Sequence, residues 1–144
     1  MSGTGKSTVL AELARRGFET FETDVEPWSK WSDESGGYVW DEGRVEELLR
    51  QERETALFVS GTVSNQGRFY DRFDEVVLLS APAEVLLERI DRRTTNPFGK
   101  SAEERERVLA DLAEVEPLLR ATCTLELDAT QPVVVLVARL TALA

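Results

Sequence analysis

The chain has 144 residues, of which 42% are hydrophobic and 31% are charged, a composition typical of a single globular domain. Seventeen lysine and arginine residues face 27 aspartate and glutamate residues, and the net charge of −10 argues against nucleic-acid binding through a basic face. There is no histidine, which excludes a Ser-His-Asp triad and a histidine metal site, and the lone Cys123 excludes a disulfide framework. The longest apolar run, residues 132–138, is far shorter than a membrane span, and with no secretory signal evident we expect a cytoplasmic protein.

The first eight residues carry a phosphate-binding motif. The run Gly5-Lys6-Ser7 matches the end of the pattern G-x-x-x-x-G-K-[ST], whose glycines let backbone N–H groups close around a phosphate. In this pattern Lys6 reaches the β- and γ-phosphates and the Ser7 hydroxyl ligates Mg²⁺. Apolar residues at helical spacing from Val9 to Ala14 predict the helix whose N-terminus also faces the anion. A glycine-rich tail before an ordinary helix is the alternative. The residues expected to bind the nucleotide here are Gly3, Thr4, Gly5, Lys6, Ser7 and Thr8.

The motif is incomplete at its start. Its first glycine would fall one position before Met1, and the strand that should lead into the loop is missing from this chain. We therefore expect the natural protein to begin about ten residues earlier, with a short apolar strand that ends in glycine.

After the first helix, residues 18–24 alternate apolar and polar side chains up to Phe21, which predicts a short strand. Asp24-Val25-Glu26 stands at the end of this strand, at the sheet edge where ligands bind in open α/β folds. Residues 27–40 are predicted to be irregular and contain all three tryptophans, Trp28, Trp31 and Trp40. Two compatible interpretations are open: a hydrophobic lid packed on the core, and an aromatic-walled pocket for a second substrate.

The rest of the chain alternates between strand and helix patterns, which predicts an α/β fold with a parallel sheet between helices. Ser101 and Glu104 form a capping-box pattern at the start of one helix. Pro97 and Gly99 interrupt the helical pattern, so residues 94–100 are expected to form a mobile lid. The predicted elements are helices at 41–54, 83–93, 101–116 and 133–143, strands at 56–59, 75–79 and 123–127, and a loop or short helix at 64–73.

Taken together, these patterns resemble the small P-loop kinases of the shikimate kinase and adenylate kinase type, over essentially the whole chain. The resemblance implies a P-loop NTPase fold with strand order 2-3-1-4-5, strand 1 being the one missing here, and a single domain over residues 1–144. In adenylate kinases two arginines four residues apart open the lid, and Arg89 and Arg93 in the run from Glu88 to Arg93 keep that spacing. The helix dipole alone would also favour arginines at this helix end.

Two further segments resemble shikimate kinases. Asp24-Val25-Glu26 is similar to their acidic pair, in which one acid holds Mg²⁺ through water and the other contacts the substrate. Ser60-Gly61-Thr62 resembles a weakened version of the glycine-rich turn at their acceptor pocket, and Asp128 to Pro132 falls at the adenine-side loop. The chain departs from these families in residues 27–40, which match neither, and in lacking an aspartate at the end of the third strand.

The resemblance implies an ATP- and Mg²⁺-dependent kinase of a small hydroxylated metabolite. Lys6, Asp24 and Arg93 are the predicted catalytic residues, Ser7 and Asp24 the metal ligands, and Arg89, Arg93 and Asp128 join the loop in binding ATP. The alternatives are a nucleotide-binding module without phosphotransfer and a truncated, inactive fragment. No paired arginines near residues 27–40 are placed to bind a monophosphate, so the acceptor is expected to be uncharged or weakly charged, with a ring or hydrocarbon face. No nucleic-acid, membrane or obligate protein partner is expected.

Overall fold

The computed structural model describes residues 3–94 and 97–144. By its internal contacts the chain divides into two compact units, which are described in turn. The first unit comprises the segment that ends at Lys6 together with Glu75–Ala138, and the second comprises Ser7–Asp74 with Arg139–Ala144. Within the described residues, no helix is both long enough and apolar enough to cross a membrane.

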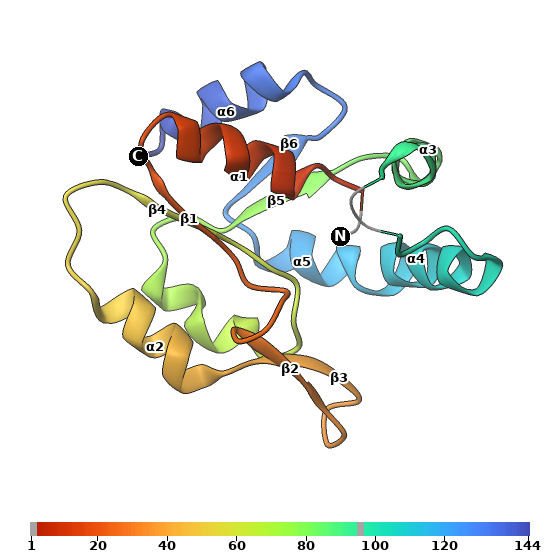
Figure 1. Ribbon diagram of the computed structural model, residues 1–144, viewed down its shortest axis with the longest axis horizontal. Helices are drawn as coiled ribbons and strands as arrows, with labels where there is room; N and C mark the ends of the chain where they lie inside the picture. The colour runs from red at the N-terminus through yellow and green to blue at the C-terminus, as the bar shows by residue number, and fades with distance from the viewer. Residues whose placement is uncertain (1–2, 95–96) are drawn as a thin grey trace. The chain divides into compact units, whose positions relative to one another are not determined.

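A parallel strand pair organises the second unit (Figure 1). Strand β1 (Glu19–Glu22) pairs with β4 (Leu57–Ser60), with Glu22 opposite Ser60 at the carboxyl ends. Helix α1 (Lys6–Arg15) precedes this pair in the chain, and α2 (Glu42–Arg50) begins at the N-cap Asp41, whose side chain accepts a hydrogen bond from the Arg44 N–H at 3.2 Å. A 3₁₀ helix, η1 (Gln66–Arg72), follows β4 where a loop or short helix is predicted. The buried side chains of this unit include Val9, Leu10, Leu13, Trp40, Val45, Leu48, Val63, Phe69 and Leu140.

The stretch predicted to be irregular is a β-hairpin. Strands β2 (Ser29–Ser32) and β3 (Gly37–Trp40) pair antiparallel, and the turn between them contains Gly36 at φ +68°. Trp31 lies opposite Tyr38, and their rings meet edge to face with centroids 5.5 Å apart. Strand β2 is Ser-Lys-Trp-Ser, with a single apolar residue, so no period-two pattern marks the hairpin in the sequence.

The first unit contains a second parallel pair (Figure 1). Strand β5 (Val77–Ser80) pairs with β6 (Leu125–Asp128), and α3 (Ala83–Arg92) follows β5 in the chain. The helix predicted at 101–116 is α4 (Ala102–Glu114). A further helix, α5 (Glu116–Thr122), follows it and was not predicted; Pro117 lies in its first turn, where a missing N–H is tolerated. Helix α6 (Val133–Thr141) begins in this unit and ends in the second. The buried side chains of the first unit include Leu78, Ala81, Leu86, Ile90, Val108, Leu127, Ala129, Leu136 and Val137.

The two parallel pairs confirm the predicted α/β class with parallel strands. In the numbering of the expected order, β1 and β4 take the places of strands 2 and 3, and β5 and β6 those of strands 4 and 5. Each pairing is therefore one that the order 2-3-1-4-5 contains.

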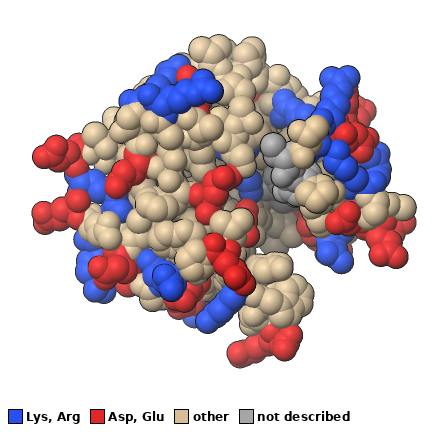
Figure 2. Space-filling model, viewed as in Figure 1, with Lys and Arg blue, Asp and Glu red and all other residues tan. Residues whose placement is uncertain are grey.

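Charged side chains of both signs alternate over the face shown in Figure 2. Charged side chains also form ion pairs within the described residues, such as Arg72 with Glu46 at 2.5 Å and Arg105 with Asp91 at 2.7 Å. Both pairs are partly exposed, so each contributes at most about 1 kcal/mol to stability.

The Ser101 capping box gives a prediction about stability. The Ser101 hydroxyl accepts the Glu104 N–H at 3.2 Å, and the Glu104 carboxylate accepts the Ser101 N–H at 3.5 Å. Ser101→Ala should lower the free energy of unfolding, measured by urea denaturation, by about 1 kcal/mol. Ser101→Thr keeps the capping oxygen and is the matched control; equal losses in the two variants would contradict a capping role.

Candidate active site

The predicted phosphate loop is a turn that leads directly into α1. Gly3 and Gly5 both have positive φ angles, +82° and +90°, and Thr4 between them is 1% exposed. Helix α1 begins at Lys6, which confirms the predicted order of glycine loop and helix. The backbone N–H groups at such a helix start suit an anion.

The two glycines of the loop are needed for different reasons. A Cβ added to Gly3 would lie 2.8 Å from the Leu86 carbonyl oxygen and 3.3 Å from the Ile90 side chain, so the loop packs against α3 at backbone distance. A Cβ at Gly5 would meet no atom within 4 Å apart from its chain neighbours. Gly5 is therefore required by its backbone conformation, and that side of the loop is open to a ligand.

Arg89 of α3 connects this loop to the segment after β6. Its guanidinium donates to the Ala129 carbonyl at 2.6 Å and to the Gly3 carbonyl at 3.4 Å. The structure thus brings together Arg89, the phosphate loop and the predicted adenine-side segment. Contact between Arg89 and a nucleotide stays a prediction.

Arg93, the second predicted lid arginine, lies directly after α3 and donates to the Phe98 carbonyl at 2.5 Å. Partial burial lowers the pKa of the Arg93 guanidinium from its ordinary value. Arginine stays protonated in proteins, so the side chain still presents a positive charge.

The predicted lid at 94–100 is only partly described, because residues 95 and 96 lie outside the described ranges. Its second half is bound to α3. Lys100 donates to the Arg93 carbonyl at 2.6 Å and to the Asp91 carbonyl at 3.0 Å, and Gly99, at φ +92°, packs against Ile90. These bonds satisfy carbonyls at the C-terminus of α3.

Asp128 is the last residue of β6, one position before the loop in which it was expected. Its carboxylate accepts hydrogen bonds from the Thr130 hydroxyl at 2.6 Å and the Thr130 N–H at 2.9 Å. The bond from the Thr130 hydroxyl contributes most, and the bond from the Thr130 N–H adds to it; together they hold the pKa of Asp128 below its ordinary value of 3.8. The Asp128 carboxylate is therefore ionised at neutral pH.

In the second unit, the predicted metal ligand Ser7 meets a carboxylate that the sequence reasoning missed. The Ser7 hydroxyl donates a short hydrogen bond to Glu22, the last residue of β1. The resemblance placed the acidic pair at Asp24 and Glu26, yet Glu22-Thr23-Asp24 also has the acid-x-acid spacing and falls directly at the strand end. Glu26 is exposed and precedes Pro27. The alternation of apolar and polar residues ends at Phe21. It could have shown that the strand ends at Glu22 and that the acidic pair begins there.

Asp24, the predicted catalytic residue, is anchored to the turn after β4. One of its carboxylate oxygens accepts the Thr62 N–H at 2.8 Å, so the Ser60-Gly61-Thr62 turn holds the acid in place. Thr8, predicted to bind nucleotide, lies exposed in the first turn of α1. In the second unit the structure therefore joins Ser7 to Glu22 and Asp24 to Thr62.

The three tryptophans have different environments. Trp40 is 5% exposed and forms a core cluster with Val45, Val63 and Phe69. The partly buried Trp28 packs against this cluster. Trp31 is 56% exposed and contacts Tyr38, which is equally exposed. Packing on the core accounts for Trp28 and Trp40, and Trp31 remains on the surface.

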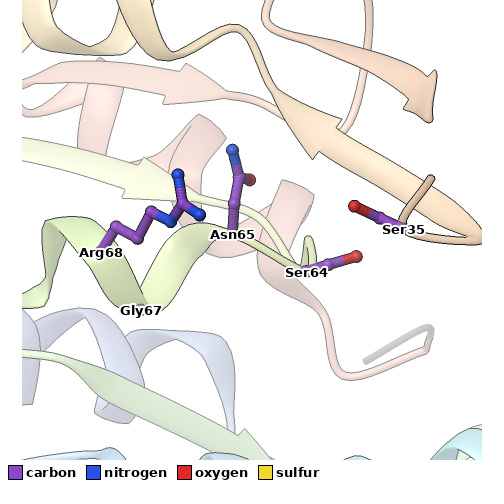
Figure 3. A pocket seen from close by; sticks show the side chains of 5 residues that line it. All are labelled: Ser35, Ser64, Asn65, Gly67 and Arg68. Carbon is purple, nitrogen blue, oxygen red and sulfur yellow. The ribbon is translucent and has the colours of Figure 1, made fainter.

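A polar hollow of about 380 Å³ lies between the hairpin turn and the start of η1 (Figure 3). Its side chains mostly hold the hairpin: Asn65 bonds both backbone groups of Trp40, at 2.8 and 3.2 Å, and Arg68 pairs with Glu42 at 3.1 Å. The hollow is lined by Ser35, Ser64, Asn65, Gly67 and Arg68.

The residues of the site provide hard oxygen ligands rather than a preformed metal cage. Within residues 3–94 and 97–144, no three acidic, histidine or cysteine side chains gather as they would around a bound ion. Mg²⁺ is usually held by one or two protein oxygens together with water and substrate phosphates. The Ser7 hydroxyl and the Glu22 carboxylate, which already touch, fit that mode.

Comparison with known proteins gives the family. Residues 1–110 match the family model described as AAA domain, and the chain belongs to this family. Its fold is similar to that of shikimate kinase from Acinetobacter baumannii in complex with shikimate, with a TM-score of 0.66 and 24% identity over 98% of this chain and 87% of that chain. At this identity the similarity establishes the fold, which is that of the P-loop kinases. No curated protein sequence matches the chain.

The Asp128 environment predicts a shifted titration. Thr130→Val removes the hydroxyl that chiefly stabilises the ionised carboxylate, so the pKa of Asp128 should rise toward its ordinary value. Carboxyl-carbon NMR measured against pH would follow the change. Glu126, whose pKa is held low chiefly by Arg120, is the internal control and should not move. An unchanged Asp128 titration would show that the Thr130 hydroxyl does not hold the carboxylate.

Proposed function

We propose that this protein is an ATP- and Mg²⁺-dependent kinase of a small hydroxylated molecule, with one P-loop kinase domain over residues 1–144. The observation that carries the proposal is the Ser7 hydroxyl resting on the Glu22 carboxylate, in the first turn of a helix that follows a loop with two positive-φ glycines. An anion-binding backbone turn with two hard oxygen ligands beside it suits a magnesium-bound phosphate.

The loop from Gly3 to Ser7 binds the phosphates through its backbone N–H groups, and Lys6 and Arg93 stabilise the charge that develops on the transferred phosphoryl group. Arg89, Thr8 and Asp128 complete the nucleotide side. Mg²⁺, when bound, neutralises phosphate charge and orients the phosphoryl group for in-line transfer. Ser7 and Glu22 hold it, and Asp24, at the second acidic position, orients the acceptor hydroxyl and takes its proton.

The charges around the hairpin favour an acceptor without a phosphate. Arg44 and Arg68 each face a carboxylate, Asp41 at 3.7 Å and Glu42 at 3.1 Å, so neither presents an uncompensated fork for a monophosphate. The similar shikimate kinase structure is a complex with shikimate, which makes shikimate one acceptor to test. We expect an uncharged or weakly charged hydroxylated molecule with a ring or hydrocarbon face.

The proposal predicts acceptor-stimulated ADP release from Mg·ATP. The purified protein is screened against hydroxylated metabolites, shikimate and nucleoside monophosphates. Lys6→Ala should lower kcat/KM by about 10²- to 10³-fold, since it removes one preorganised positive charge from the transition state. Arg50→Ala, at the exposed end of α2, removes a positive charge outside the proposed site; it is the control and should behave as wild type.

Two outcomes would contradict this assignment. ATP binding without any acceptor-stimulated turnover would make the protein a nucleotide-binding module. Efficient phosphorylation of a nucleoside monophosphate would overturn the proposed acceptor class.

A separate prediction identifies the metal-binding acid. Glu22→Gln removes the carboxylate charge next to Ser7, so calorimetry should show ATP binding that needs a higher Mg²⁺ concentration than in wild type. Glu26→Gln changes the exposed acid two residues beyond Asp24 and should leave the Mg²⁺ dependence unchanged. The reverse ranking of the two variants would assign the metal to Glu26.

A further inference from the structure

The two acids assigned to the metal and to the acceptor flank one buried residue. Thr23 lies between Glu22 and Asp24 and is 0% exposed. Its N–H donates to the Ser60 carbonyl at 2.9 Å, which extends the β1–β4 ladder by one residue. Glu22 is the last residue of β1 and Asp24 follows Thr23 directly, so the backbone of Thr23 connects the two acids. Whatever fixes the rotation of the chain at Thr23 therefore aims both acids.

The Thr23 hydroxyl is held from two directions. It donates to the Ser60 carbonyl at 2.7 Å and accepts the indole N–H of Trp40 at 2.8 Å. Both bonds are shielded from water, and a buried hydroxyl that lost its donor would carry a desolvation cost. The bond to Ser60 ties Thr23 to β4, and the bond from Trp40 ties it to the hairpin.

Trp40 is itself rigidly placed. Its backbone N–H and carbonyl both bond the side-chain amide of Asn65, at 2.8 and 3.2 Å, and its ring packs edge to face on Phe69 with centroids 5.7 Å apart. The residue is 5% exposed. The indole N–H is thus a fixed donor aimed at Thr23 rather than a surface group that meets it by chance.

Gly61 shows how closely these groups meet. A Cβ at this position would lie 2.5 Å from the Thr23 hydroxyl oxygen, and 3.4 Å from both the Trp40 ring and an Asp24 carboxylate oxygen. Only glycine leaves room for the hydroxyl, the indole and the carboxylate at the end of β4. The glycine in the Ser60-Gly61-Thr62 turn therefore has a packing role at this junction.

We propose that Trp40 is a positioning residue for phosphoryl transfer, which acts through the Thr23 hydroxyl to aim Glu22 and Asp24. The inference rests on the kinase function proposed above. It gives the hairpin a role in the reaction that does not require Trp40 to touch either substrate. A purely structural role would need the volume of these side chains and not their hydrogen bonds.

Two substitutions at Thr23 separate the alternatives. Thr23→Val keeps the shape and removes the hydroxyl, whereas Thr23→Ser keeps the hydroxyl and loses a methyl group. We expect kcat to fall about tenfold in Thr23→Val, the factor that corresponds to one lost hydrogen bond, with KM for ATP unchanged. Thr23→Ser should stay within about twofold of wild type. Trp40→Phe, which keeps an aromatic ring without the N–H, should match Thr23→Val, and the double variant should be no worse than either alone.

A second readout does not depend on activity. In ¹H–¹⁵N NMR spectra the Trp40 indole N–H should exchange slowly with solvent in wild type and in Thr23→Ser, and quickly in Thr23→Val. Backbone amides of residues 22–24 and 60–62 should follow the same ranking in hydrogen exchange. If no acceptor supports turnover, the kinase function fails while these exchange measurements still report whether the link exists. Slow, wild-type-like exchange of the Trp40 indole N–H in Thr23→Val would overturn the proposal. So would a kcat that falls as far in Thr23→Ser as in Thr23→Val.

Discussion

The parallel pairing of β1 with β4 is the constraint on which the acidic part of the site depends. Because Glu22 lies opposite Ser60, both strands end at the same level, and the residues just beyond them meet. Thr23 bonds the Ser60 carbonyl and Asp24 bonds the Thr62 N–H, so two successive residues after β1 are fixed by two backbone groups after β4. A slip of one residue would turn the acids to the opposite side of the sheet, since side chains alternate. The chemistry therefore depends on strand register more than on any single side chain.

The phosphate loop depends on a different contact, its close packing on α3. Gly3 approaches the Leu86 carbonyl too closely for any side chain, and Arg89 from the same helix bonds the Gly3 and Ala129 carbonyls. A predicted nucleotide-binding arginine thus also has a structural role. In a chain with net charge −10 the overall field opposes an anion, so a phosphate would have to be held by local positive groups such as this arginine.

The AAA domain family and the P-loop kinase fold place this chain among proteins with a phosphate-binding loop. The proposed acceptor side is the part of the chain that departs most from the families it resembles. Here it is a short hairpin with one tryptophan in the core and another exposed beside Tyr38. Function in such folds is carried by the site rather than by the fold, so the hairpin is where the specificity of this protein is expected to lie.

The sequence alone determined the α/β class, the phosphate loop with its following helix, and most strands and helices, because each of these rests on local signals: glycine conformation, capping and hydrophobic period. It also predicted Ser7, Asp24 and the turn at residues 60–62 as neighbours of a ligand, which stays a prediction. It did not find the hairpin, in which β2 carries a single apolar residue and shows no period, or the short helix α5 that follows α4. Only the tertiary structure brought Glu22 to Ser7 and Trp40 to Thr23. These partners are 15 and 17 residues apart in sequence, and their contacts follow from strand pairing and side-chain packing, which no local pattern encodes.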